Sequence, residues 1–353
     1  MDQLFDRQTL QSAWNQMLES LGRHECDLKA VSVLDILFGY RMLCGRWPGS
    51  EEAALWLSRP PDAGLDSLIR ALAGTPEGRS RALSIEFERP AHDCLVMTET
   101  PKGLRFFFSL RDAFVGMPIA VGVFEKDVEG ALARILRHGM NCIDAGANLG
   151  FYTVQMAAAA SLGGGRVFSF EPDQFAFSLL SRNVNENHLQ NSVELFQTAC
   201  GACNEAAVLL SDPNPSNYGG MHIGGVAAAG SASAQEVLVK QVNDVISSDI
   251  RIDLIKVDVE GYELYTLLGM RRILQVHRPV ILIEFNTPAL RVQSPDCPAR
   301  LYSFLCELDY SLYEAAHFAA GVAKEFQFTN DESDVFVNLV CMPGGRTPDE
   351  FLG

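Results

Sequence analysis

The chain has 353 residues, of which 48% are apolar and 20% charged, and its formal net charge is −16. This length predicts two domains, and the composition is that of an ordinary globular protein. The acidic balance argues against a nucleic-acid partner, because proteins that bind nucleic acid gain affinity from clustered lysine and arginine.

The cysteines and the first residues indicate the compartment. Nine cysteines, an odd number, are scattered along the chain, and no apolar signal region follows Met1. No run approaches the roughly 18–20 uninterrupted apolar residues that a transmembrane helix needs. We therefore expect a reduced, cytoplasmic protein without a membrane span.

The first 89 residues have a helical pattern. Apolar residues recur at steps of three and four from Leu10 to Leu21 and from Val31 to Met42. The segment Tyr40–Pro48 (YRMLCGRWP) is similar to a small helical module found beside glycan-modifying enzymes. We expect residues 1–89 to form a helical domain for packing, docking or homodimerisation, followed by a second domain at 90–353.

The second domain begins with a predicted β-hairpin. Leu95–Thr98 and Leu104–Leu110 are β-like runs separated by the turn Pro101-Lys102-Gly103. Glu125 then precedes a predicted helix at about Asp127–Arg137. Strands and helices alternate in the rest of the chain, which predicts βαβ units and a parallel sheet covered on both faces.

The pattern predicts nine strands and four longer helices after residue 139, together with a short helix that begins at Gln241–Asp244. The loop Ser211–Ala234 is rich in Gly, Ser, Asn and Ala, and a loop of this length in a compact domain is either a functional lid or disordered. We expect Asn217–His222 to be a partly ordered flap that faces a ligand. The predicted strands are Met140–Ala145, Arg166–Phe170, Val193–Thr198, Ala206–Leu210, Val237–Val242, Asp253–Val257, Pro279–Glu284, Tyr310–Tyr313 and Val335–Met342, and the helices are Phe151–Ala160, Gln174–His188, Tyr262–Arg272 and Pro298–Leu308.

The segment Ile143–Gly150 (IDAGANLG) predicts a nucleotide-type pocket. A short β-run that ends on an acid and is followed by glycines turns tightly into a helix and leaves backbone N–H groups facing a ligand. A P-loop would need a lysine after Gly150, and a dinucleotide fingerprint would need glycine in place of Asn148. The Asp144 carboxylate would repel a pyrophosphate but suits a cofactor with an amino acid and a sulfonium, such as S-adenosylmethionine.

Glu171 ends the next predicted strand. It lies 21 positions beyond Gly150 (171 − 150), close to the roughly 20-residue offset at which an acid binds a ribose in Rossmann-like sites. The two oxygens of one carboxylate can accept from both the 2′- and the 3′-hydroxyl. Glu171 is therefore the predicted ribose ligand.

Three motifs in this order resemble the FkbM family of S-adenosylmethionine-dependent methyltransferases: Cys142–Tyr152 (CIDAGANLGFY), Phe170–Pro172 (FEP) and Asp253–Glu263 (DLIKVDVEGYE). The resemblance covers roughly residues 106–340. It implies an α/β, Rossmann-like class I methyltransferase fold, with a mostly parallel seven-stranded sheet, its last strand antiparallel, and helices on both faces. The cofactor-binding residues that we predict are Glu125, Asp144, Gly146, Asn148, Gly150, Phe151, Glu171, Pro172, Thr198, Ala199 and Asp258.

Three acids follow adjacent predicted strands and are candidates for the reaction. A carboxylate or imidazole that acts as general base contributes typically ~10²–10⁴-fold. Asp258, Glu260 and Glu284 are the predicted catalytic residues, with His222 of the flap as a further candidate. We expect Asp258 to lie nearer the sulfonium and Glu260 to reach toward the acceptor. The alternative, that both only organise their loop through N–H bonds or a lysine partner, stays open.

The predicted reaction is O-methylation of a sugar, a glycan intermediate or a secondary metabolite. An NAD-dependent Rossmann oxidoreductase is an alternative, although it would need the glycine missing at position 148. A non-catalytic cofactor-binding module is another. We expect no metal, because methyl transfer to a lone hydroxyl does not require one, although three carboxylates would suit Mg²⁺ or Ca²⁺.

Overall fold

The computed structural model describes residues 86–87, 94–210, 217, 219–224, 234–329 and 333–352, together with Tyr40, Glu52, Leu55 and Leu68. Contacts divide the chain into two units, Met1–Ser84 and Ile85–Gly353. The predicted helical module falls almost wholly outside the described residues. The second unit carries the three motifs and is described below by itself.

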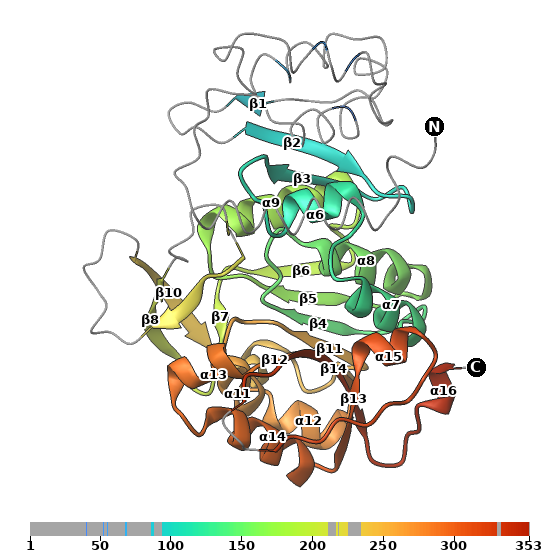
Figure 1. Cartoon of the computed structure of the whole chain (residues 1–353), viewed down its shortest axis with the longest axis vertical. Helices are drawn as coiled ribbons and strands as arrows, with labels where there is room; N and C mark the ends of the chain where they lie inside the picture. The colour runs from blue at the N-terminus through green and yellow to red at the C-terminus, as the bar shows by residue number, and fades with distance from the viewer. Residues whose placement is uncertain are drawn as a thin grey trace. The chain divides into compact units, whose positions relative to one another are not determined.

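The second unit is built on a seven-stranded mixed sheet with the strand order β13-β14-β12-β11-β4-β5-β6 (Figure 1). The five strands from β12 to β6 pair in parallel, and β14 is antiparallel to both of its neighbours, β12 and β13. The strands are β4 (Cys142–Ala145), β5 (Val167–Phe170), β6 (Val193–Phe196), β11 (Leu254–Val257), β12 (Val280–Asn286), β13 (Tyr310–Glu314) and β14 (Phe336–Pro343).

The second unit also contains helices, several of which cover this sheet. They are α6 (Gly116–Val121), α7 (Lys126–Ile135), α8 (Phe151–Ala160), α9 (Gln174–Glu186), α10 (Val242–Val245), α11 (Glu263–Leu268), α12 (Arg271–His277), α13 (Thr287–Gln293), α14 (Cys297–Glu307), α15 (Ala315–Ala319) and α16 (Asp349–Leu352), with a 3-10 turn at Ser161–Gly163. Within the described ranges, no helix is long and apolar enough to cross a membrane.

The two faces of the sheet differ in polarity. Residues such as Ile143, Ile255 and Ile281 pack with side chains of α11, α12 and α14 in one apolar core. On the other face the strand register aligns Ser169, Asp144 and Lys256 in one row, and α8 packs against it. Burial of polar and charged groups lowers the stability of a fold unless the groups are paired. The polar residues of this second face therefore indicate a function.

One predicted helix is wrong in its extent. The segment Tyr262–Arg272 is split into α11 and α12. The break lies at Gly269, where the backbone passes so close to the carbonyl oxygen of Gly201 that a Cβ would overlap it.

Residues 199–240 contribute a separate four-stranded sheet that the sequence did not predict. Its strand order is β7-β10-β8-β9, with β7 at Ala199–Cys200, β8 at Glu205–Leu210, β9 at His222–Gly224 and β10 at Ala234–Lys240. Of the predicted flap Asn217–His222, the structure describes residue 217 and residues 219–222. His222 begins β9, so it lies on a strand and not in a loop.

The predicted hairpin is present as β2 (Cys94–Glu99) and β3 (Arg105–Ser109), and β1 (Glu86–Phe87) pairs with β2. Asn183 of α9 joins this hairpin to the loop that precedes α8. Its Oδ1 accepts from the N–H of Phe107 at 2.6 Å, and its Nδ2 donates to the carbonyls of Phe107 at 3.0 Å and Leu149 at 2.8 Å. Asn183 is fully buried, so water cannot replace these bonds.

Asn183→Ala is expected to lower the free energy of unfolding by roughly 2–4 kcal/mol, because it leaves several buried backbone groups without partners. Asn187 is the matched control, because it makes the same pair of bonds to the backbone of Arg105 in an exposed position. Asn187→Ala should cost less than about 1 kcal/mol. Chemical denaturation of both variants measures the difference, and equal losses would contradict the assignment.

Candidate active site

The loop between β4 and α8 is a run of left-handed backbone positions. Gly146, Asn148 and Gly150 have φ values of 81°, 50° and 91°. At Gly146 a Cβ would overlap the carbonyl oxygen of Asp258. Only glycine fits there, and the loop of the first motif therefore touches the loop of the third motif.

Glu171 holds this loop from the end of β5. Its Oε2 accepts from the N–H of Asn148 at 2.8 Å, and its Oε1 accepts from the N–H of Asp173 at 2.9 Å. Burial raises the pKa of Glu171 to about 7, against the lowering effect of these two N–H groups. The motif residue predicted to bind a ribose is thus positioned by the backbone and changes its charge near neutral pH.

Asp144 lies beneath α8. It is fully buried, and its Oδ2 accepts from the hydroxyl of Thr153 at 2.6 Å. Its Oδ1 has no hydrogen-bond partner among the described residues. Burial raises the pKa of Asp144, whereas Lys256 and Thr153 lower it. Asp144 is therefore a buried, only partly hydrogen-bonded member of the polar row on the sheet, and the predicted cofactor loop follows it in the chain.

A cluster of carboxylates lies where β11 and β12 end. Burial first, and then the nearby carboxylates of Asp258, Glu260, Glu263 and Glu125, raise the pKa of Glu284 to about 10. The Oε2 atom of Glu284 is buried and has no hydrogen-bond partner within the described ranges. Glu284 is therefore protonated at neutral pH, where it offers a hydrogen bond and not a base.

Lys256 is the cation beside these acids. Its Nζ lies 2.9 Å from Oδ2 of Asp258 and 4.7 Å from the centre of the Tyr152 ring. The Tyr152 hydroxyl donates to Oε2 of Glu125 at 2.7 Å. Burial, followed by the charge of Asp258, raises the pKa of Glu125 to about 7. The structure thus brings Glu125 and Asp258, which are 133 positions apart (258 − 125), to one lysine.

The loop after β11 is organised by a further acid. Oε1 of Glu263 accepts from the N–H groups of Val259 and Gly261 at 3.2 and 3.1 Å. Burial raises the pKa of Glu263 to about 7. The alternative for Asp258 and Glu260 was that they organise their loop through backbone N–H bonds or a lysine partner. The N–H bonds are made by Glu263, and the lysine partner is that of Asp258.

The other predicted site residues are distributed around this centre. Phe151 begins α8, Pro172 follows Glu171, and Thr198 lies between β6 and β7, where Ala199 begins β7. His222 lies in β9, on the separate four-stranded sheet. Among the described residues, no group of three or more His, Cys, Asp or Glu side chains is placed to hold a metal.

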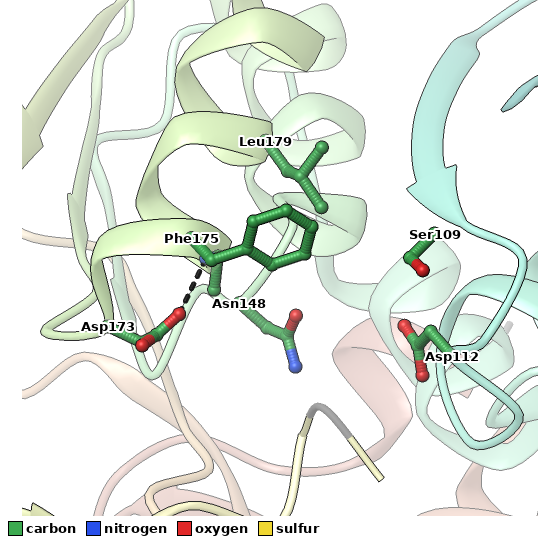
Figure 2. Close-up of a pocket in the computed structure, with 7 residues that line it drawn as sticks. Ser109, Asp112, Asn148, Asp173, Phe175 and Leu179 are labelled. Carbon is green, nitrogen blue, oxygen red and sulfur yellow. Dashed lines mark hydrogen bonds between the residues drawn. The ribbon is translucent and has the colours of Figure 1, made fainter. Parts of the chain in front are cut away.

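A hollow opens beside Asn148, between the start of α9 and the loop that follows β3 (Figure 2). Phe175 and Leu179 line it from α9, and Ser109 and Asp112 face it from the opposite side. Asp112 accepts from the N–H groups of residues 114–116, and burial raises its pKa to about 6. The segment after β3, which the sequence predicted only as an entry to the domain, therefore forms one wall of the hollow next to the cofactor loop.

The predicted flap also reaches the cofactor loop. A Cβ at Gly219 would lie 3.0 Å from Cγ2 of Val115 and 3.2 Å from Nδ2 of Asn148. Oδ1 of Asn217 accepts from the N–H groups of Gly219 and Gly220 at 3.2 and 3.1 Å. This short turn therefore packs on Asn148, whereas His222 lies farther along the chain on β9.

The site residues that the sequence did not reveal are Lys256, Tyr152, Asp112 and Ser109. Lys256 left a visible signal, because it is a lysine inside the apolar strand LIKV. Tyr152 belonged to a motif but had no predicted role. Asp112 left no signal, since an Asp in a connecting segment is the normal composition of a turn. Ser109 left none either, at the end of a predicted β-run.

Comparison with known proteins identifies the domain. Residues 144–312 match the methyltransferase FkbM domain. Over this range the chain is similar to FkbM methyltransferases, and the resemblance predicted from the three motifs is confirmed.

Individual proteins are similar to this chain over part of their length. The methyltransferase sdnD of Sordaria araneosa is 29% identical over 157 residues, which cover 36% of this chain and 59% of sdnD, less than two thirds of its length. The FkbM methyltransferase structure from Methylobacillus flagellatus KT is 15% identical, with a TM-score of 0.37 over 86% of this chain and 58% of that one. The O-methyltransferase TomG from Streptomyces achromogenes is 13% identical, with a TM-score of 0.36 over 62% of this chain and 80% of TomG.

Glu284→Gln is expected to stabilise the second unit at alkaline pH. The pKa of Glu284 is raised from 4.5 to about 10 in the folded state, so the folded protein binds this proton more tightly than the unfolded chain does. The stabilisation is complete below about pH 4.5 and is lost as the pH rises toward 10. Glutamine keeps the uncharged form, and we expect it to raise Tm near pH 8–9 by roughly 2–4 °C for each kcal/mol recovered.

Thermal unfolding of the wild type and Glu284→Gln between pH 5 and pH 9 measures this effect. The Tm difference should vanish near pH 5 and grow with pH. Glu350→Gln is the control, because Glu350 is an acid on the surface helix α16. A Tm difference for Glu284→Gln that does not change with pH would contradict the protonated state of Glu284.

Proposed function

We propose that this protein transfers a methyl group from S-adenosylmethionine to a hydroxyl of a sugar, a glycan intermediate or a secondary metabolite. The observation that carries this proposal is the contact of Gly146 with the Asp258 carbonyl. It joins the predicted cofactor loop to the loop that bears Asp258 and Glu260, at the edge where parallel strands end. Ligands of open α/β sheets bind outside this edge.

The residues present fit S-adenosylmethionine. Each oxygen of Glu171 accepts one backbone N–H, and a carboxylate offers about four lone pairs. Two therefore remain for the 2′- and 3′-hydroxyls of a ribose. The left-handed turn from Gly146 to Gly150 brings the backbone, and no side chain, to the ligand. The acids near Asp258 suit the cofactor's positive charges.

When bound, the cofactor supplies an electrophilic methyl group on a sulfonium. The chain has to orient the acceptor hydroxyl in line with that methyl group, exclude water and receive the hydroxyl proton. Glu284 in its protonated form would donate a hydrogen bond to the acceptor. Asp258, which is paired with Lys256, or Glu260 would then take the proton.

The acceptor class rests on chemistry and on the family. The net charge of −16 disfavours the polyanionic surface of nucleic acid. Acids with raised pKa values suit a hydroxyl group, which has a high pKa and needs help to lose its proton. The resemblance of residues 40–48 to a module found beside glycan-modifying enzymes favours a sugar or glycan among the possible hydroxyls.

The wild-type protein should bind S-adenosylmethionine, and the affinity should rise as the pH passes about 7. The pKa of Glu171 is about 7, and only its ionised form offers acceptors to both ribose hydroxyls. Glu171→Ala should weaken binding at least tenfold, the equivalent of about 1.4 kcal/mol. Glu171→Gln should bind weakly without the pH dependence.

Calorimetry between pH 5.5 and pH 8.5 measures both effects. Glu194→Gln is the control, because Glu194 lies on β6 and pairs with Arg166 on the surface. Equal dissociation constants for the wild type and Glu171→Ala would remove the ribose assignment. Binding of NAD in place of S-adenosylmethionine would support the oxidoreductase alternative.

Methyl transfer should yield an ether on a small molecule or a glycan. Incubation of the protein with methyl-labelled cofactor and fractionated cell extracts would locate the labelled product. We expect the label in the carbohydrate or small-metabolite fraction, and base treatment should not release it, since an ether is stable where an ester is not. Label confined to RNA or protein would contradict the proposal.

A further inference from the structure

Lys256 occupies an unusual position for a lysine. It lies in β11, at the centre of the sheet, between Ile255 and Val257, which are both fully buried. Only 6% of its side chain is exposed. A lysine in such a place normally loses its charge or is replaced by an apolar residue, because burial of an ammonium costs several kcal/mol. Retention of a lysine here therefore points to a task that a leucine could not perform.

The ammonium keeps its charge because of its neighbours. Burial alone would lower the pKa of Lys256, but the carboxylates of Asp258, Glu125 and Asp144 raise it above its usual value. The register of β11 with β4 places Lys256 beside Asp144. The ammonium is thus a permanent cation under the edge of the sheet.

Contacts on two sides fix the direction of this cation. Oδ2 of Asp258 accepts from Nζ at 2.9 Å. The ring of Tyr152 lies 4.7 Å from Nζ, and its hydroxyl is itself held by Glu125 at 2.7 Å. A cation over an aromatic ring is attracted to its face. The lysine therefore holds the carboxylate of Asp258 from below, and only a quarter of the Asp258 side chain is exposed.

We propose that Lys256 is a positioning residue, which fixes the Asp258 carboxylate in the orientation that faces the sulfonium of S-adenosylmethionine. This inference rests on the proposed function. The lysine itself touches no ligand and acts through Asp258, with Tyr152 and Glu125 as its lateral support.

The sign of the effect separates positioning from simple charge. If Lys256 contributed only its charge, its removal would leave the edge more negative, and a cationic ligand would bind more tightly. If it positions Asp258, its removal frees that carboxylate, and the cationic ligand binds more weakly. S-adenosylhomocysteine lacks the sulfonium charge and should respond less than S-adenosylmethionine.

Calorimetric titration of the full chain with both compounds tests this inference. Lys256→Met should weaken S-adenosylmethionine binding about tenfold or more, because a hydrogen bond between charged groups is lost. Asp258→Asn should weaken it to a similar extent. The double variant should bind S-adenosylmethionine no more than about twofold worse than the single variant that binds more weakly, because both substitutions remove the same interaction.

Lys256→Arg keeps the charge but carries a broad planar head group in place of the compact ammonium. Lys256→Arg should also weaken S-adenosylmethionine binding. If Lys256→Met does not fold, Lys256→Arg replaces it in the double-mutant cycle with Asp258→Asn. Lys324→Met is the control, since Lys324 is half-exposed and pairs with Glu314 at the surface. Its affinity should equal that of the wild type.

Two results would overturn the positioning role: S-adenosylmethionine affinity of Lys256→Met equal to or tighter than that of the wild type, or losses that multiply in the double variant. These results differ from a failure of the proposed function, in which the wild type itself would not bind the cofactor. Wild-type binding with an unaffected Lys256→Met variant would remove the positioning role and leave methyl transfer in place.

Discussion

The approach of the Gly146 backbone to the Asp258 carbonyl is the constraint on which the site depends. Any side chain at position 146 would separate the two loops and move the acids of the third motif away from the cofactor loop. The N–H of Asp258 also donates to the carbonyl of Ala145 at 3.0 Å, so the parallel pairing of β4 and β11 continues to the point where the loops diverge. The geometry of the site therefore follows from strand register and from one glycine.

One face of the sheet stabilises the fold, and the other carries the buried polar residues next to the site. The face toward α11, α12 and α14 is apolar and packs in one hydrophobic cluster, and burial of apolar surface is the dominant favourable contribution to folding. The face toward α8 holds Ser169, Asp144 and Lys256 in one row. Thr153 bridges Asp144 and Ser169 at 2.6 and 2.9 Å. This polar row costs stability, and the apolar face allows the fold to tolerate it.

Much of the fold could be predicted from the sequence, because it depends on local patterns. Helix α8 has the predicted bounds, Phe151–Ala160, since a left-handed Gly150 sets its start. The seven strands of the main sheet lie close to their predicted positions, because buried parallel strands are continuous apolar runs. The second sheet was missed, since its order β7-β10-β8-β9 depends on pairing between distant segments.

The site was harder to predict, because its chemistry depends on burial and distance. The motifs indicated Glu171 and Asp258, and the end of a predicted strand indicated Glu284, but only the fold shows that Glu284 is buried among other acids and keeps its proton. A lysine in an apolar strand is visible in the sequence. Its partners, Asp258 and the ring of Tyr152, are not. The spacing of the acids in the sequence predicts that they lie at one edge of the sheet. It does not predict their protonation, because that depends on contacts between residues that are distant in the sequence.

The excess of acid over base at this edge has a consequence for the proposed chemistry. Methyl transfer to a hydroxyl converts a sulfonium into a neutral thioether and releases one proton, so the positive charge leaves the sulfur and reappears as that proton. A site that stabilises the cation before the reaction can therefore stabilise the proton after it, provided that one of its acids titrates near neutral pH. Glu125, whose pKa burial and Asp258 raise to about 7, meets this condition. Glu125 lies beside the Lys256–Asp258 pair, with the Tyr152 side chain between them, so a proton that Asp258 or Glu260 first accepts could come to rest on Glu125 with no change in the total charge of the site.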